Sequence, residues 1–111
     1  MKTAEEMLKK EVEKQKLWIE DCATGNGESD FDEVVDEVLD IEIMRSFRGD
    51  FRGFEITLCL GGPNIFLSHH ISQYNAYLKG VWGSESVELP LNEETSDMLL
   101  EYMEELADSY A

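Results

Sequence analysis

Carboxylates dominate residues 30–42, "DFDEVVDEVLDIE", in which seven side chains are acidic and none is basic. Such a cluster could bind calcium, supply an acid–base pair, replace the phosphates of a nucleic acid, or form an ordinary solvated surface. An EF-hand calcium loop requires oxygen ligands at positions 1, 3 and 5 and a glycine at position 6. Counted from Asp30, positions 5 and 6 are Val34 and Val35, which excludes this loop and leaves only a looser carboxylate site as an alternative.

The other candidates for catalysis or metal binding lack the spacing that such chemistry needs. His69 and His70 are adjacent in a predicted strand, so their side chains point to opposite faces and cannot chelate one ion. Cys22 and Cys59 are 37 residues apart, which matches no zinc or redox motif, and we expect both to be reduced thiols with a packing role. The sequence has neither a phosphate-binding glycine loop nor a nucleophile elbow. It therefore predicts a protein that is not an enzyme and has no cofactor and no bound metal.

The net charge is the strongest compositional signal. The 111 residues carry 9 Lys and Arg against 25 Asp and Glu, a formal charge of −16. Residues 1–22 are nearly neutral, with five lysines and six acids, whereas residues 23–111 hold four basic residues against 19 acids. This sign argues against direct binding to nucleic acid or to an anionic membrane. It favours basic protein surfaces as partners.

We expect neither a targeting signal nor a membrane span in this chain. No segment approaches the roughly 20 apolar residues that a membrane span needs. The N-terminal sequence "MKTAEEMLKKEVEK" becomes charged and helical where a signal peptide would become apolar. These features predict a cytoplasmic location.

Hydrophobic periodicity predicts an α+β fold in a single domain, residues 1–111. A helix is expected over residues 3–22, and it either packs on the domain or serves as a dimerisation arm. A short acidic helix is expected to begin at Asp30, with Phe31, Val35 and Val38 or Leu39 on its apolar face. From Ile41 the period changes to two, which predicts an antiparallel four- to five-stranded meander over residues 40–47, 54–60, 64–70, 75–82 and 86–91. Asn92 is the expected N-cap of a last, acidic helix whose buried stripe holds Leu99, Tyr102 or Met103, Leu106 and Tyr110.

The two acidic helices place carboxylates in rows. Asp97, Glu101, Glu105 (or Glu104) and Asp108 follow one face of the last helix at steps of about 4.5–6 Å, comparable with successive phosphates along a strand. Asp32, Asp36 and Asp40 give the short helix a second row at the same step, flanked by Glu33 and Glu37. Like charges four residues apart destabilise a helix, and neither row has an interleaved lysine. The pattern therefore favours a surface selected for its sign over one selected only for polarity.

Three segments carry a resemblance. "FEITLCLGGPNIFL", "YLKGVWG" and "DMLLEYMEEL" together resemble small acidic proteins of phages and mobile elements from Gram-positive gut bacteria. The resemblance covers residues 40–108, and its most specific part is the GGPN turn followed by the Trp-Gly strand. It implies an origin in elements that must survive host nucleases.

These observations predict an acidic inhibitor of a host defence enzyme that binds nucleic acid, either an anti-CRISPR or an anti-restriction protein. The inhibitor would act as a nucleic-acid mimic on a basic groove, with a partner-binding surface formed by Asp32, Glu33, Asp36, Glu37, Asp40, Asp97, Glu101, Glu104, Glu105 and Asp108. The alternative is a non-catalytic interaction module, a homodimer through residues 1–22, whose acidity is only solvation and whose anchors are Trp18, Tyr77 and Trp82. The basic cluster of Arg45, Arg48 and Arg52 has no assigned role in either hypothesis.

Overall fold

The computed structural model describes residues 3–24 and 31–109, with the side chains of Thr24 and Asp32 excepted, and confirms the predicted α+β fold. Its elements are, in chain order, α1 (Ala4–Thr24), α2 (Phe31–Glu37), β1 (Asp40–Arg45), β2 (Phe51–Cys59), β3 (Asn64–His70), β4 (Tyr77–Trp82), β5 (Glu85–Pro90) and α3 (Glu93–Ser109).

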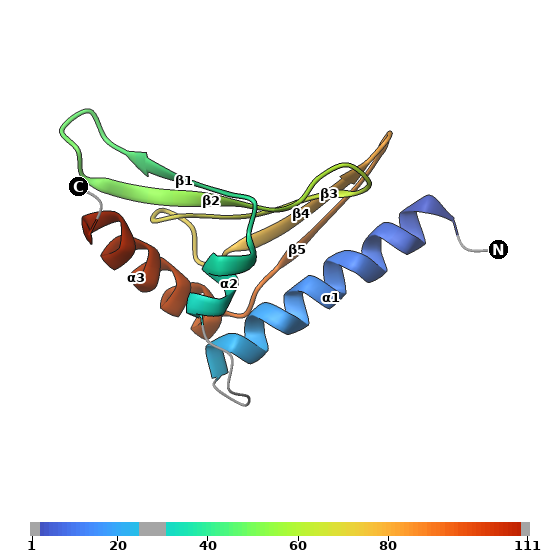
Figure 1. Cartoon of the computed structure of the whole chain (residues 1–111), viewed down its shortest axis with the longest axis horizontal. Helices are drawn as coiled ribbons and strands as arrows, with labels where there is room; N and C mark the ends of the chain where they lie inside the picture. Colours follow the sequence, from blue (N-terminus) through green and yellow to red (C-terminus); the bar gives the residue numbers. More distant parts are fainter. Residues whose placement is uncertain (1–2, 25–30, 110–111) are drawn as a thin grey trace.

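The five strands form one antiparallel sheet in the order β1-β2-β3-β4-β5, so each strand pairs with its neighbours in sequence. Both long helices lie on the same side of this sheet and diverge as a V from a vertex where α1 ends and α3 begins (Figure 1). The first of them, α1, packs along β4 and β5, and α3 packs along β2. Among the described elements, no helix covers the opposite face of the sheet, which we call the open face (Figure 1).

The core lies between the sheet and the V of helices. Each strand contributes alternate residues to it, as in β3, where Ile65, Leu67 and His69 are buried while their neighbours are half-buried. The apolar side chains larger than alanine that have no exposed surface come from both layers: Leu8, Val12, Ile19, Val34, Phe54, Ile56, Ile65, Leu67, Leu78, Leu99 and Met103. Each such burial stabilises the fold by about 1.5–3 kcal/mol relative to exposure.

A glycine in β4 sets the distance between α1 and the sheet. Gly80 is buried beneath α1, and a Cβ atom at this position would lie 2.5 Å from Cγ2 of Val12 and 2.9 Å from Cδ1 of Leu8. Any larger residue would therefore force the Val12 and Leu8 side chains, or α1 with them, to move.

Hydrogen bonds fix the vertex of the V. The predicted N-cap is confirmed, because the Thr95 amide donates to Oδ1 of Asn92 at 2.7 Å. The buried Ser96 hydroxyl accepts from the Ala76 amide at 2.8 Å and donates to the Asn92 carbonyl at 2.7 Å. On the α1 side, the amide of Asn92 donates to Oε2 of Glu20 at 2.9 Å. The start of α3 is thus tied both to the β3–β4 loop and to the end of α1.

The short helix α2 departs from its prediction in two ways. Val34 is fully buried, although the expected apolar face omitted it, while Val35 is half-buried and Leu39 is 59% exposed. The helix also ends at Glu37, and Asp40 begins β1. The Leu39 amide already donates to the Thr57 carbonyl at 2.9 Å, so pairing with β2 replaces helical hydrogen bonding here. The β-branched Val38 and Ile41 that surround this point favour the strand.

Candidate protein-binding surface

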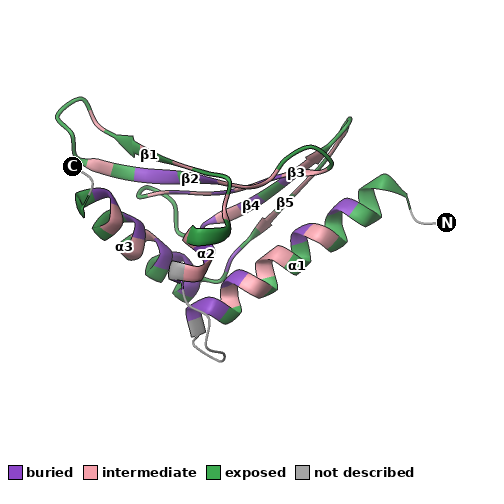
Figure 2. Ribbon diagram, viewed as in Figure 1, coloured by how far each residue is buried: buried purple, intermediate pink, exposed green. Residues whose placement is uncertain are grey.

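The outer face of α3 carries the row of carboxylates that the sequence predicts. Its buried side holds Leu99, Met103 and Ala107 together with the hydroxyl residues of the first turn. Tyr102 and Leu106 are partly buried, and Tyr110 lies outside the described residues. The opposite side presents five exposed acids: Asp97, Glu101, Glu104, Glu105 and Asp108. At 1.5 Å per residue this row is about 16 Å long. Figure 2 shows exposed residues along the outer side of α3.

These carboxylates form no ion pair with a cation among the described residues. Helix α3 contains no Lys, Arg or His. Within residues 3–24 and 31–109, none of the five side chains takes part in a hydrogen bond or an ion pair. Their negative charge is therefore not neutralised by the described part of the chain.

Helix α2 brings further acids next to α3. The Phe31 ring contacts the Tyr102 ring edge-on, with centroids 5.6 Å apart, which places the start of α2 against the middle of α3. Asp36 and Glu37 are exposed, and Glu33 is half-buried. Asp30 and the side chain of Asp32 lie outside the described residues. Beside the Phe31–Tyr102 contact, Glu101 and Glu105 border a shallow hollow of about 210 Å³.

The prediction of a second acidic row on α2 is wrong at Asp40. This residue lies in β1 instead of on α2, and its side chain is exposed on the open face of the sheet with those of Glu42 and Glu55. Glu42 and Glu55 are register partners on β1 and β2, so two like charges stand directly opposite each other. This arrangement destabilises a sheet, and sequence reasoning missed it because the register of the two strands was not known. The only signal in the sequence was a glutamate among the outward positions of each strand.

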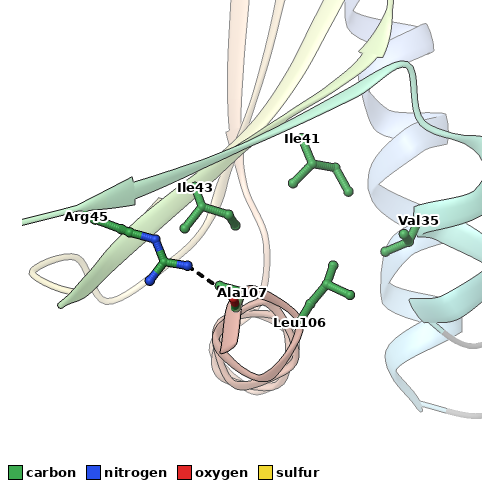
Figure 3. Close-up of a pocket in the computed structure, with 6 residues that line it drawn as sticks. All are labelled: Val35, Ile41, Ile43, Arg45, Leu106 and Ala107. Carbon is green, nitrogen blue, oxygen red and sulfur yellow. Dashed lines mark hydrogen bonds between the residues drawn. The ribbon is translucent and has the colours of Figure 1, made fainter. Parts of the chain in front are cut away.

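An apolar groove runs between β1 and α3 (Figure 3). It has a volume of about 360 Å³, and its walls are Ile41 and Ile43 of β1, Val35 of α2, and Leu106 and Ala107 of α3. Arg45 lies at one end, where its Nη2 donates to the Ala107 carbonyl at 3.1 Å and its Nη1 donates to the Gly49 carbonyl at 3.3 Å.

This contact gives Arg45 the role that the sequence could not assign. The last turn of α3 contains no basic residue. Arg45 supplies a positive charge and a donor at the negative end of that helix, 62 residues away in sequence. Arg48 and Arg52 are exposed and do not join it at the helix end.

The two histidines lie on opposite faces of β3, as predicted. His69 is buried beside Phe54, its Nε2 donates to the Gln73 carbonyl at 3.1 Å, and its Nδ1 has no hydrogen-bond partner among the described residues. His70 is half-buried on the open face. Within the described residues Cys22 and Cys59 form no disulfide, and Cys22 is buried while Cys59 is half-buried. Within the ranges that the structure describes, no three His, Cys, Asp or Glu side chains are arranged to hold a metal ion.

The anchors of the alternative hypothesis are dispersed. Tyr77 lies on the open face and Trp18 packs against the core, both half-buried, while Trp82 is 37% exposed at the end of β4. More apolar surface is free on α1, where Met7 is 45% and Leu17 is 62% exposed beside Lys10 and Lys14.

Comparison of the chain with protein-family models, with curated proteins and with solved structures finds no match in any of the three. The resemblance to phage and mobile-element proteins therefore stays a prediction. In the part of the chain that the structure covers, no helix combines the length and the hydrophobicity required to cross a membrane.

Proposed function

We propose that this protein is an inhibitor that occupies the basic nucleic-acid-binding groove of a host defence nuclease, such as a CRISPR effector or a restriction enzyme, in the bacterial cytoplasm. The observation that carries the proposal is the outer face of α3, where five exposed carboxylates follow one another without a cation between them. A face selected only for solvation mixes both signs, as α1 does with its alternating Glu and Lys.

The chemistry of the proposed contact follows from the row's geometry. Arg and Lys side chains that normally bind phosphates would bind the carboxylates of α3 in charge-assisted hydrogen bonds. A row of about 16 Å covers roughly five base-pair steps of about 3.4 Å. Asp36 and Glu37 on the adjacent α2 extend the negative field beyond this row. Association would be accelerated by this field and weakened by salt.

The test is affinity capture from a host lysate, with and without excess duplex DNA, followed by mass spectrometry. The bait is compared with a variant in which Asp97, Glu101 and Glu105 are all changed to Lys. A matched control changes three exposed acids of α1 to Lys, namely Glu5, Glu6 and Glu13, so that the net charge shifts equally. We expect a nucleic-acid-binding protein that DNA displaces, that the α3 variant fails to retain, and that the α1 control retains. Equal retention by both variants would refute the role of α3.

The second candidate is an interaction module with apolar contacts, and the exposed Met7 and Leu17 of α1 favour it. Salt separates the two functions. A complex held by carboxylates dissociates at about 1 M NaCl, where the screening length falls to about 3 Å, whereas an apolar interface persists.

A further inference from the structure

The edge of the sheet at β1 differs from the edge at β5. Both strands lie at an end of the sheet order, so each has one side without a strand neighbour among the described residues. Helix α1 packs along β5, while α3 packs along β2 and leaves the groove of about 360 Å³ between itself and β1. The free edge of β1 therefore borders an apolar groove, as Figure 3 shows for Ile41 and Ile43, which both point toward α3.

We infer that β1 accepts an extended segment of a basic partner as a sixth strand of the sheet. An edge strand presents unpaired N–H and C=O groups along its free side, and an added strand pairs with them. Alternate residues of that segment would point into the groove and meet the apolar wall of Ile41, Ile43 and Leu106. At the far end the wall gives way to Arg45, which excludes a basic side chain from that position of the groove.

Charge complementarity defines the other residues of the segment. Asp40 and Glu42 are exposed on the open face of β1, so the intervening side chains of an added strand would stand directly beside them. Glu42 already faces the like charge of Glu55 on its other side. A Lys or Arg at the matching position would relieve this repulsion. The expected segment therefore alternates apolar and basic residues over the 6 positions of β1.

Protection of the edge explains only part of this arrangement. Charged residues on an edge strand discourage unwanted pairing, which would account for Asp40 and Glu42. It does not account for the half-buried Ile41 and Ile43 on the other face of the same strand, which leave the groove apolar and open. An apolar groove beside an acidic edge matches a segment that is itself apolar on one face and basic on the other.

The inference shares with the proposed function the expectation of a basic partner, but its test uses defined peptides in place of that partner. Three labelled nine-residue peptides are compared by fluorescence anisotropy: alternating Val and Lys, the same composition with Val and Lys in separate blocks, and alternating Val and Glu. We expect the alternating Val/Lys peptide to bind most tightly. Backbone amide shifts in nuclear magnetic resonance spectra should map its binding to residues 40–45.

Glu42→Lys is the decisive variant, because Glu42 is exposed and its replacement leaves the core intact. Reversing the charge of a cross-strand pair should weaken binding of the Val/Lys peptide by about fivefold to tenfold and strengthen binding of the Val/Glu peptide. Glu88→Lys is the control for net charge, since Glu88 is exposed on the open face of β5 at the opposite edge, where it faces Lys79 instead of an acid, and we expect less than a twofold change.

Any of these results would overturn the inference: equal binding of the blocked peptide, equal losses in Glu42→Lys and Glu88→Lys, or amide shifts on α3 instead of β1. Self-association of the protein through β1, detected as concentration-dependent shifts without peptide, would also overturn it by naming a second copy as the occupant. The α3 variant of the proposed function should still bind the Val/Lys peptide. Failure of peptide binding with intact lysate capture would thus refute strand addition alone.

Discussion

Glu101→Lys on α3 should stabilise the fold while it weakens partner binding. Glu101 is exposed, and its carboxylate neighbours on the helix are Asp97 at i−4, Glu104 at i+3 and Glu105 at i+4. Each like pair on a helix costs about 0.2–0.5 kcal/mol, and each opposite pair contributes a similar amount. Converting the three pairs from repulsive to attractive should raise the free energy of unfolding by about 1–3 kcal/mol.

The assay is urea denaturation followed by circular dichroism in low-salt buffer. With a slope of about 2 kcal/mol per molar urea, the midpoint should rise by about 0.5–1.5 M. Glu101→Gln removes the repulsion without adding attraction and should give about half of this shift. At about 1 M NaCl the difference from the natural sequence should nearly vanish for both variants.

An unchanged or lowered midpoint for Glu101→Lys would refute the reasoning. It would mean that Glu101 stabilises the native state through a contact of its own, for example along the hollow that it borders with Phe31. The carboxylates of α3 would then have a structural explanation. A raised midpoint with weakened capture of the partner is the combination that indicates a row retained for binding at the expense of stability.

Three further predictions concern the fold. Ser96→Ala should lower the free energy of unfolding, measured by urea denaturation, by about 1–3 kcal/mol, because it leaves the Ala76 amide unpaired. The neighbouring variant Thr95→Val should be neutral or stabilising, because the buried Thr95 hydroxyl has no partner among the described residues. Equal effects of the two variants would contradict this. Gly80→Ala should lower the melting temperature, reduce the free energy of unfolding by about 1–3 kcal/mol and shift the side-chain resonances of Val12. Unchanged spectra would show that α1 does not approach β4 so closely. Raising NaCl from about 20 mM to about 500 mM should raise the melting temperature of the natural sequence, since a chain of charge −16 repels itself, and a lower value would mean that attractive pairs dominate.

The elements of the fold could be predicted where local signals agree. Asn92 before a helical period marked the start of α3, and the alternation of residues 64–70 between turn residues marked β3 with the bounds that the structure shows. In α2 the local signals conflict, because its acids fit a helical row while its valines fit a strand. The structure resolves the conflict through the partner strand β2, and Asp40 leaves the row as a result.

The candidate surfaces likewise contain features that local sequence signals predict and features that they do not. The row on α3 was predictable because residues three and four apart on a helix share a face. The contact of Arg45 with Ala107 was not, since it joins residues 62 positions apart. The opposition of Glu42 and Glu55 depends on the register of β1 on β2, and the groove depends on where α3 lies beneath the sheet. None of these is encoded by local spacing.

The V formed by α1 and α3 also determines where an affinity tag or a fluorophore should be attached for these measurements. The vertex is fixed by Glu20, Asn92 and Ser96, so the free ends of the arms are Ala4 on α1 and Ser109 on α3 (Figure 1). Ser109 is two residues from Ala107 and therefore adjoins the groove and the acidic row. Ala4 lies at the far tip of the other arm. Affinity tags and fluorophores therefore belong at the N-terminus, and a bulky group on the C-terminal arm should by itself act as a reversible block of both surfaces.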